Sequence, residues 1–148
     1  APNLGGLQCQ PRRYDESQRS FDQALAVSGY LEKARTLMAL GVCQAIQGKR
    51  DEAEKSLFRA YELDPGNPII SYNLASLLFN RGDLERAQFH LRRLNNSQLA
   101  NAETLWLGMK VERKLGDRLA TVQLGEQLRR RFPQSREAQA YDRGAFDE

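Results

Sequence analysis

The sequence predicts an all-α fold in which antiparallel helical hairpins stack one on the next, an α-solenoid. The strongest observation is a period, because Gly48, Gly82 and Gly116 stand 34 residues apart, the length of a two-helix repeat. Apolar residues between these glycines recur at helical spacing, and glycine or proline ends the apolar segments except in residues 68–101, where Leu99 stands in place of the proline. The chain has 148 residues, of which 41% are hydrophobic and 28% charged, so it can bury a core without metals or disulfides. We therefore expect a single domain over residues 1–148.

The clearest hairpin is predicted over residues 34–67. Its first helix ends at Gly48, and its second helix begins near Arg50 with acidic residues in the first turn. Pro65 cannot continue that helix, so it ends the hairpin and sets the next one at an angle. The apolar residues that we expect to fill the seam between the two helices are Leu37, Leu40, Leu57 and Ala60.

Small residues are expected where the two helices of a hairpin come closest. Gly41 and Ala53 occupy these positions in the clearest hairpin, and a larger side chain there would push the backbones apart. Residues 102–135 depart from this pattern, because Met109 and Thr121 stand at the corresponding positions. This hairpin is therefore expected to be the most divergent one.

The remaining chain follows the same register. Hairpins are predicted over residues 68–101 and 102–135, and a truncated repeat over residues 1–31. A two-residue excess around residues 28–30 separates the truncated repeat from the next, which we expect to be a loop. Residues 134–145 are expected to form a final helix that caps the last apolar face.

The start of the chain carries neither a basic segment nor a continuous apolar run, so it does not have the form of a signal peptide. It opens inside a helical pattern without a starting methionine. We therefore expect a fragment or processed form whose N-terminal part has been removed. The most apolar stretch, residues 69–79, contains three polar residues, and we expect no direct membrane insertion by this chain.

The repeat resembles the tetratricopeptide repeat (TPR) family, a 34-residue helix–turn–helix with small residues at two positions and a proline near its end. Residues 34–67 match this pattern best, and the matching residues are Leu40-Gly41, Ala53, Ala60 and Pro65. The resemblance covers nearly the whole chain. It implies a right-handed superhelix whose first helices line a concave groove that binds protein segments.

Seven segments are similar in order and content to the C-terminal repeats of the PilF/PilW type IV pilus biogenesis lipoproteins of Gram-negative bacteria. They are residues 3–10, 13–16, 21–25, 28–30, 40–43, 102–110 and 128–135. The resemblance implies about the last four repeats of a six-repeat solenoid. It also implies a periplasmic protein held at the outer membrane by an N-terminal lipid anchor upstream of this chain. The implied function is to assist secretin assembly, with secretin subunits or other pilus assembly proteins as partners.

Cys9 and Cys43 both fall on the first helices of neighbouring repeats. In a cytosolic protein these residues are expected to be small buried apolar side chains. In an exported protein the even count and the adjacent helices favour a disulfide. The pilus-family resemblance also fits a disulfide between them.

The residues of first helices that lie outside the hairpin seams are predicted to face the groove. They offer aromatic and aliphatic side chains flanked by basic ones, which suits an extended or helical peptide. For each residue taken singly, packing against a neighbouring repeat is the favoured interpretation, whereas for the groove as a whole we expect binding, because solenoids generally use this surface. The predicted protein-binding groove comprises Arg35, Met38, Val42, Ile46, Ile69, Tyr72, Phe79, Asn80, Trp106, Lys110 and Arg113.

Catalytic, metal and cofactor sites are not expected. The single histidine, His90, has no nearby nucleophile and is interpreted as a surface or edge residue. The basic clusters Arg92-Arg93 and Arg129-Arg130-Arg131 lack interleaved aromatic residues, which favours a solvated face or an acidic partner over nucleic acid. A chaperone-type carboxylate clamp is also disfavoured, because Met38 and Val42 occupy its Lys and Asn positions. A general cytosolic TPR adaptor and a regulatory TPR module of a larger enzyme remain alternative functions.

Overall fold

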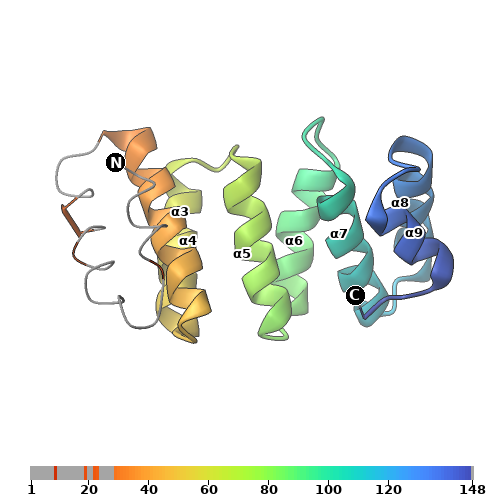
Figure 1. The fold of residues 1–148 in the computed structure, drawn as a ribbon, viewed down its shortest axis with the longest axis horizontal. Helices are drawn as coiled ribbons and strands as arrows, with labels where there is room; N and C mark the ends of the chain where they lie inside the picture. Colours follow the sequence, from red (N-terminus) through yellow and green to blue (C-terminus); the bar gives the residue numbers. More distant parts are fainter. Residues whose placement is uncertain (1–8, 10–18, 20–21, 24–28, 148) are drawn as a thin grey trace. The chain divides into compact units, whose positions relative to one another are not determined.

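The computed structural model describes residues 9, 19, 22, 23 and 29–147, so the truncated repeat expected over residues 1–31 lies almost entirely outside the described residues. The chain falls into two compact units, Ala1–Leu77 and Leu78–Glu148. Residues 29–147 form helices joined by short turns and contain no strand (Figure 1). The helices are α3 (Tyr30–Ile46), α4 (Arg50–Leu63), α5 (Pro68–Asn80), α6 (Leu84–Asn95), α7 (Ala102–Leu115), α8 (Arg118–Arg131) and α9 (Arg136–Arg143).

The three glycines of the 34-residue period have the same structural role. Gly48, Gly82 and Gly116 adopt φ values of 80°, 83° and 84°, in the left-handed region that favours glycine. Each follows the first helix of a hairpin, and its N–H bonds back to a carbonyl of that helix. The period therefore marks the turn inside each hairpin, which confirms the predicted helix–turn–helix organisation.

In the first unit, α3 and α4 pack along their length as a hairpin. A Cβ atom built on Gly41 would lie 2.6 Å from Cγ of Leu57 and 3.2 Å from the carbonyl oxygen of Ala53. No side chain fits there without displacing α4, which confirms that this glycine allows the close approach. The buried cluster in this unit comprises Ala34, Leu37, Ala60 and Ile70.

The start of α3 differs from the prediction. Of the loop expected at residues 28–30, the structure describes Gly29, which is extended and is the N-cap of α3, and Tyr30, which is already the first residue of that helix. The carbonyl of Gly29 accepts a hydrogen bond of 2.8 Å from the N–H of Lys33, which makes the first helical turn. The helix extends one turn beyond the repeat pattern because no proline or other helix breaker follows Gly29.

In the second unit, side-chain caps define where α7, α8 and α9 begin. Asn101 and Thr104 form a reciprocal capping box at the start of α7, and Asp117 caps α8. Ser135 caps α9, which ends at Gly144 with φ of 69°. The final helix is therefore Arg136–Arg143, shorter at both ends than the expected 134–145, because these two residues stop it.

The core of the second unit is held by residues of α7, α8 and α9. Met109 is fully buried there, at a position where the repeat pattern called for a small residue. The close approaches are made instead by Gly108, which faces Asn95 and Leu124, and by Gly125, which faces the ring of Tyr141. The buried members of this core are Ala100, Leu105, Trp106, Met109, Leu128, Ala138 and Ala140.

Candidate functional site

The groove residues predicted in the first unit are partly exposed and partly packed. Ile46 and Ile69 are 63% and 58% exposed, and Arg35 is also exposed. Met38 is half-buried because it packs against the Ala34 cluster. Val42 and Tyr72 are half-buried too. The first unit therefore presents apolar side chains that a partner could cover.

In the second unit one residue of the predicted groove lies in the core, which agrees with the packing interpretation of single groove residues. Trp106 is only 7% exposed and belongs to the core, where its ring stacks on that of Phe146 with 6.0 Å between centroids. It cannot serve as an exposed anchor, because the segment after α9 covers it. Phe79 is half-buried, and Asn80 is exposed.

The exposed side of α7 carries three cations next to aromatic rings. Nζ of Lys110 lies 5.7 Å from the ring centroids of both Phe79 and Trp106. The Lys114 ammonium lies 5.8 Å from the Phe79 ring. On the same side, Cζ of Arg113 lies 4.5 Å from the Phe146 ring. We call Lys110, Arg113 and Lys114 the α7 cationic face.

Burial lowers the pKa of Lys110 from its ordinary value, since the half-buried ammonium loses part of its hydration. The flanking rings offset part of that loss through cation–π attraction. The structure thus brings together Phe79, Trp106, Lys110 and Arg113 of the predicted groove with Lys114 and Phe146. Their common feature is positive charge held against apolar surface, an arrangement suited to an acidic segment with apolar side chains.

Cys9 and Cys43 are bonded as a disulfide in the structure, with 5.2 Å between their Cα atoms. Cys43 is buried on α3 and packs with Leu40, and Cys9 packs against the same pair. The bond links a residue before the described helices to the middle of α3. A disulfide is typical of an oxidising compartment.

His90 is not the surface residue expected from the sequence, since it is 5% exposed on α6. Burial is the main cause that lowers its pKa below 6.5, and the charges of Arg86 and Arg93 lower it further. Its ring meets that of Phe89 edge to face at 5.2 Å. A neutral, buried imidazole in this environment is part of the packing.

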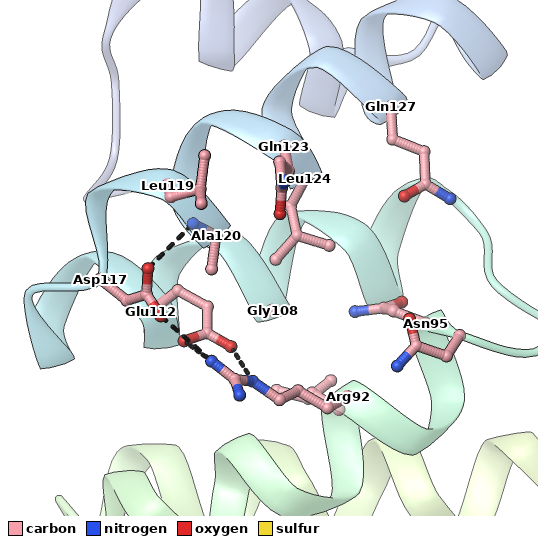
Figure 2. Close-up of a pocket in the computed structure, with 12 residues that line it drawn as sticks. Arg92, Asn95, Gly108, Glu112, Asp117, Leu119, Ala120, Gln123, Leu124 and Gln127 are labelled. Carbon is pink, nitrogen blue, oxygen red and sulfur yellow. Dashed lines mark hydrogen bonds and ion pairs between the residues drawn. The ribbon is translucent and has the colours of Figure 1, made fainter.

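A polar pocket of about 340 Å³ lies between α6 and α8, with α7 beneath it (Figure 2). Arg92 and Asn95 reach it from α6, and Leu124 and Gln127 from α8. Gly108 of α7 forms part of its floor, next to the side-chain amide of Asn95.

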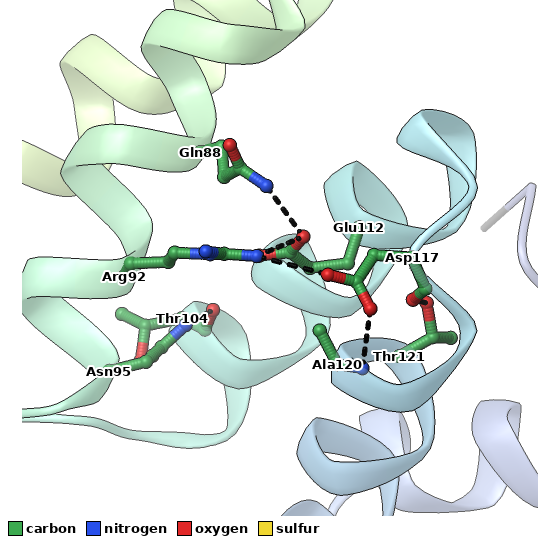
Figure 3. Close-up of polar contacts among 8 residues, drawn as sticks. All are labelled: Gln88, Arg92, Asn95, Thr104, Glu112, Asp117, Ala120 and Thr121. Carbon is green, nitrogen blue, oxygen red and sulfur yellow. Dashed lines mark hydrogen bonds and ion pairs between the residues drawn. The ribbon is translucent and has the colours of Figure 1, made fainter.

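The charged end of this pocket is an ion-pair network that joins three helices (Figure 3). Glu112 accepts hydrogen bonds from Nε and Nη2 of Arg92, at 2.7 and 3.0 Å, and from Nε2 of Gln88 at 2.8 Å. Arg92 also reaches Asp117 at 3.2 Å. The other oxygen of Asp117 caps the N–H of Ala120 on α8. These carboxylates are fully engaged, so the network holds α6, α7 and α8 together.

Asn95 has a structural role beside that network. Its side-chain amide donates to the carbonyl of Thr104 at 2.9 Å and fills the space above Gly108, where a Cβ atom would lie 2.5 Å from Nδ2. The amide therefore joins the end of α6 to the first turn of α7. Sequence reasoning missed Asn95, Gly108 and the pair Arg92–Glu112, because these contacts join residues 9 to 20 positions apart that share no motif.

The predicted basic clusters are divided between internal pairs and solvent. Besides Arg92, Arg129 of α8 pairs with Asp142 of α9 at 2.6 Å. In contrast, Arg130 and Arg131 are exposed. In the described part of the chain there is no group of three potential metal ligands and no helix long and apolar enough to cross a bilayer.

Comparisons with known proteins agree with this architecture. Two tetratricopeptide repeat models match residues 11–68 and 44–104. The type IV pilus assembly protein PilF of Pseudomonas aeruginosa is 25% identical over 139 residues, which is 94% of this chain and 55% of PilF.

Two solved structures share the fold. A structure of Pseudomonas aeruginosa PilF superimposes with a TM-score of 0.75 at 25% identity, covering 96% of this chain and 64% of that one. The crystal structure of PilW, described as a type IV pilus biogenesis factor, gives a TM-score of 0.82 at 30% identity, covering 95% and 64%. This chain thus spans less than two thirds of these relatives. It belongs to the tetratricopeptide repeat family and is an all-α TPR solenoid of the PilF/PilW type.

Proposed function

We propose that this chain is a non-enzymatic scaffold for type IV pilus biogenesis, which assists assembly of the outer-membrane secretin by binding a protein partner. Support comes from the similarity to PilF and PilW and from the general use of TPR repeats in protein–protein recognition. The observation that carries the proposal is the α7 cationic face. Three like charges over one helix side repel each other, and a partner with acidic residues relieves that repulsion.

A catalytic role has no support in the second unit. The one buried carboxylate of the polar pocket, Glu112, already accepts three hydrogen bonds, and its side chain is 3% exposed. His90 is buried beside two arginines, which favours its neutral form and leaves no access for a substrate. A module that binds a protein partner and catalyses no reaction accounts for the environments of both residues.

We place the protein in the periplasm, held at the outer membrane by a lipid anchor outside this chain. The supporting observation is the bond between Cys9 and Cys43, because disulfides persist in the bacterial periplasm and are rare in the cytosol. Fractionation of bacteria that produce the full-length protein tests this location. Recovery in the cytosolic fraction would favour a cytosolic adaptor instead.

The test of function uses the full-length gene in a piliated bacterium. Arg113→Glu/Lys114→Glu reverses two exposed charges of the α7 cationic face. Arg130→Glu/Arg136→Glu is the matched control, since both residues are exposed on other helices and the charge change is the same. We expect detergent-resistant secretin multimers and surface pili to decrease at least fivefold only with the first pair. Equal levels in both strains, with both proteins present at normal abundance, would overturn the proposal.

A further inference from the structure

A second pocket, of about 680 Å³, opens in the second unit where α7, α8 and the segment after α9 meet. Arg113 from the last turn of α7 and Arg118 from the first turn of α8 stand at its rim. Val122, Tyr141 and Phe146 form its apolar wall. We call this site the arginine pocket. It is separate from the polar pocket between α6 and α8, with which it shares no residue.

The rim of the arginine pocket has a single sign of charge. Arg113 and Arg118 are both exposed, and no carboxylate lines the pocket. Within residues 29–147, neither guanidinium forms an ion pair with an acidic side chain. By contrast, Arg92 and Arg129 of the same unit are both paired with acidic residues. The two rim arginines therefore retain donors for a carboxylate brought by another molecule.

The wall of the pocket provides apolar contact. Val122 is 51% exposed on α8 and offers a branched aliphatic side chain to the pocket. The rings of Tyr141 and Phe146 are half-buried with 6.4 Å between their centroids. Aromatic and aliphatic walls with a few charged groups at the rim are typical of pockets that hold one large side chain of a peptide.

We infer that the arginine pocket binds an acidic segment of a partner protein, with one apolar side chain against Val122 and neighbouring carboxylates on Arg113 and Arg118. This inference rests on the proposed function, because it names the chemistry of the segment that the scaffold recognises. The two rim arginines favour an acidic segment through charge complementarity. The concave apolar wall favours a peptide with an anchoring side chain over a flat anionic surface. Lys114, on the same last turn of α7 as Arg113, adds a further positive charge for the flanking residues.

The test measures binding of a fluorescein-labelled heptapeptide with a central phenylalanine between three acidic residues on each side. Val122→Asp places a negative charge in the arginine pocket. Leu119→Asp is the matched control, because Leu119 is 69% exposed on the same helix and lines the other pocket. By fluorescence anisotropy we expect Kd to rise at least tenfold with Val122→Asp and less than twofold with Leu119→Asp. Circular dichroism verifies that both variants retain the helix content of the parent chain.

A second pair of measurements separates specific binding from general attraction. Replacing the central phenylalanine of the peptide by glycine is expected to raise Kd at least fivefold. The variant Arg118→Gln is expected to make the Kd of the original peptide depend less on the salt concentration. Equal effects of Val122→Asp and Leu119→Asp would overturn the inference, as would equal binding of the glycine peptide. Binding of phosphatidylglycerol vesicles through Val122, without peptide binding, would assign the pocket to a membrane instead. The secretin assay with Arg113→Glu/Lys114→Glu is read separately, so either hypothesis can fail while the other stands.

Discussion

Arg92→Ala tests whether the ion-pair network holds the second unit together. The substitution removes the contacts of Arg92 to Oε2 and Oε1 of Glu112, at 2.7 and 3.0 Å, and its contact of 3.2 Å to Asp117. Only the hydrogen bond from Gln88 then remains on the buried carboxylate. The unfolding free energy should therefore decrease.

The expected decrease follows from the burial of the two partners. Breaking a fully buried pair costs about 3–5 kcal/mol, because one charge is left without compensation. Here the side chain of Glu112 is 3% exposed but that of Arg92 is 50% exposed, so water can enter the vacated space and screen the carboxylate. We therefore expect Arg92→Ala to lower the unfolding free energy by about 2 kcal/mol. At an m-value of about 2 kcal/mol/M, this lowers the urea midpoint by about 1 M.

The assay is urea unfolding followed by the fluorescence of Trp106, the single tryptophan of the chain and a member of the same unit. A double-mutant cycle with Glu112→Gln isolates the pair, and the double variant should cost at least about 1 kcal/mol less than the sum of the single variants. Arg130→Ala, an exposed residue, is the control and should stay within about 0.5 kcal/mol of the parent chain. A similarly small effect of Arg92→Ala, with no coupling to Glu112, would refute the reasoning.

Three further predictions concern the core, the cysteines and the histidine. Trp106→Ala should lower the unfolding free energy by about 3–5 kcal/mol, and the half-buried Phe79→Ala by clearly less, in urea unfolding followed by circular dichroism. An equal loss of unfolding free energy in the two variants would contradict the burial of the tryptophan. Cys9 and Cys43 should resist alkylation until a reductant is added, and mass spectrometry that finds two alkylated thiols without reductant would remove the support for export. The folded pKa of His90 lies below its unfolded value of 6.5, so its contribution to the unfolding free energy should be complete above pH 6.5. That contribution should decline by up to about 1.4 kcal/mol per pH unit as the pH falls towards the folded pKa. The variant His90→Gln should flatten that part of the pH profile, and an unchanged profile would show that another group is responsible.

Local backbone requirements are the part of the fold that could be predicted from the sequence. A residue with positive φ is nearly always glycine, so the recurrence of Gly48, Gly82 and Gly116 located the hairpin turns before any coordinates. A close helix approach needs a missing side chain, which identified Gly41. Both requirements act within a few residues of the chain, and a sequence pattern records them directly.

Which face of a helix another element covers could not be predicted in the same way. His90 was expected at the surface, yet the packing of α6 buries it. Trp106 was included in the predicted groove with packing as the favoured interpretation, and the pattern did not indicate that Phe146 would be the residue that covers it. Asn95 fills the space above Gly108 because its side chain has the right length and direction, and no period encodes that match. Contacts of this kind depend on helix rotation and side-chain shape, so the candidate site was predicted only in part.

Gly125 and Tyr141 have a consequence for the interchange of modules between solenoids. In the two preceding hairpins the equivalent position carries Leu57 and Leu91, whereas here the tyrosine ring of α9 occupies the place that such a leucine would need. An engineer who grafts α9 onto another hairpin must therefore bring the glycine with it, and one who restores the leucine must replace the tyrosine. The two residues must therefore be exchanged as a single unit.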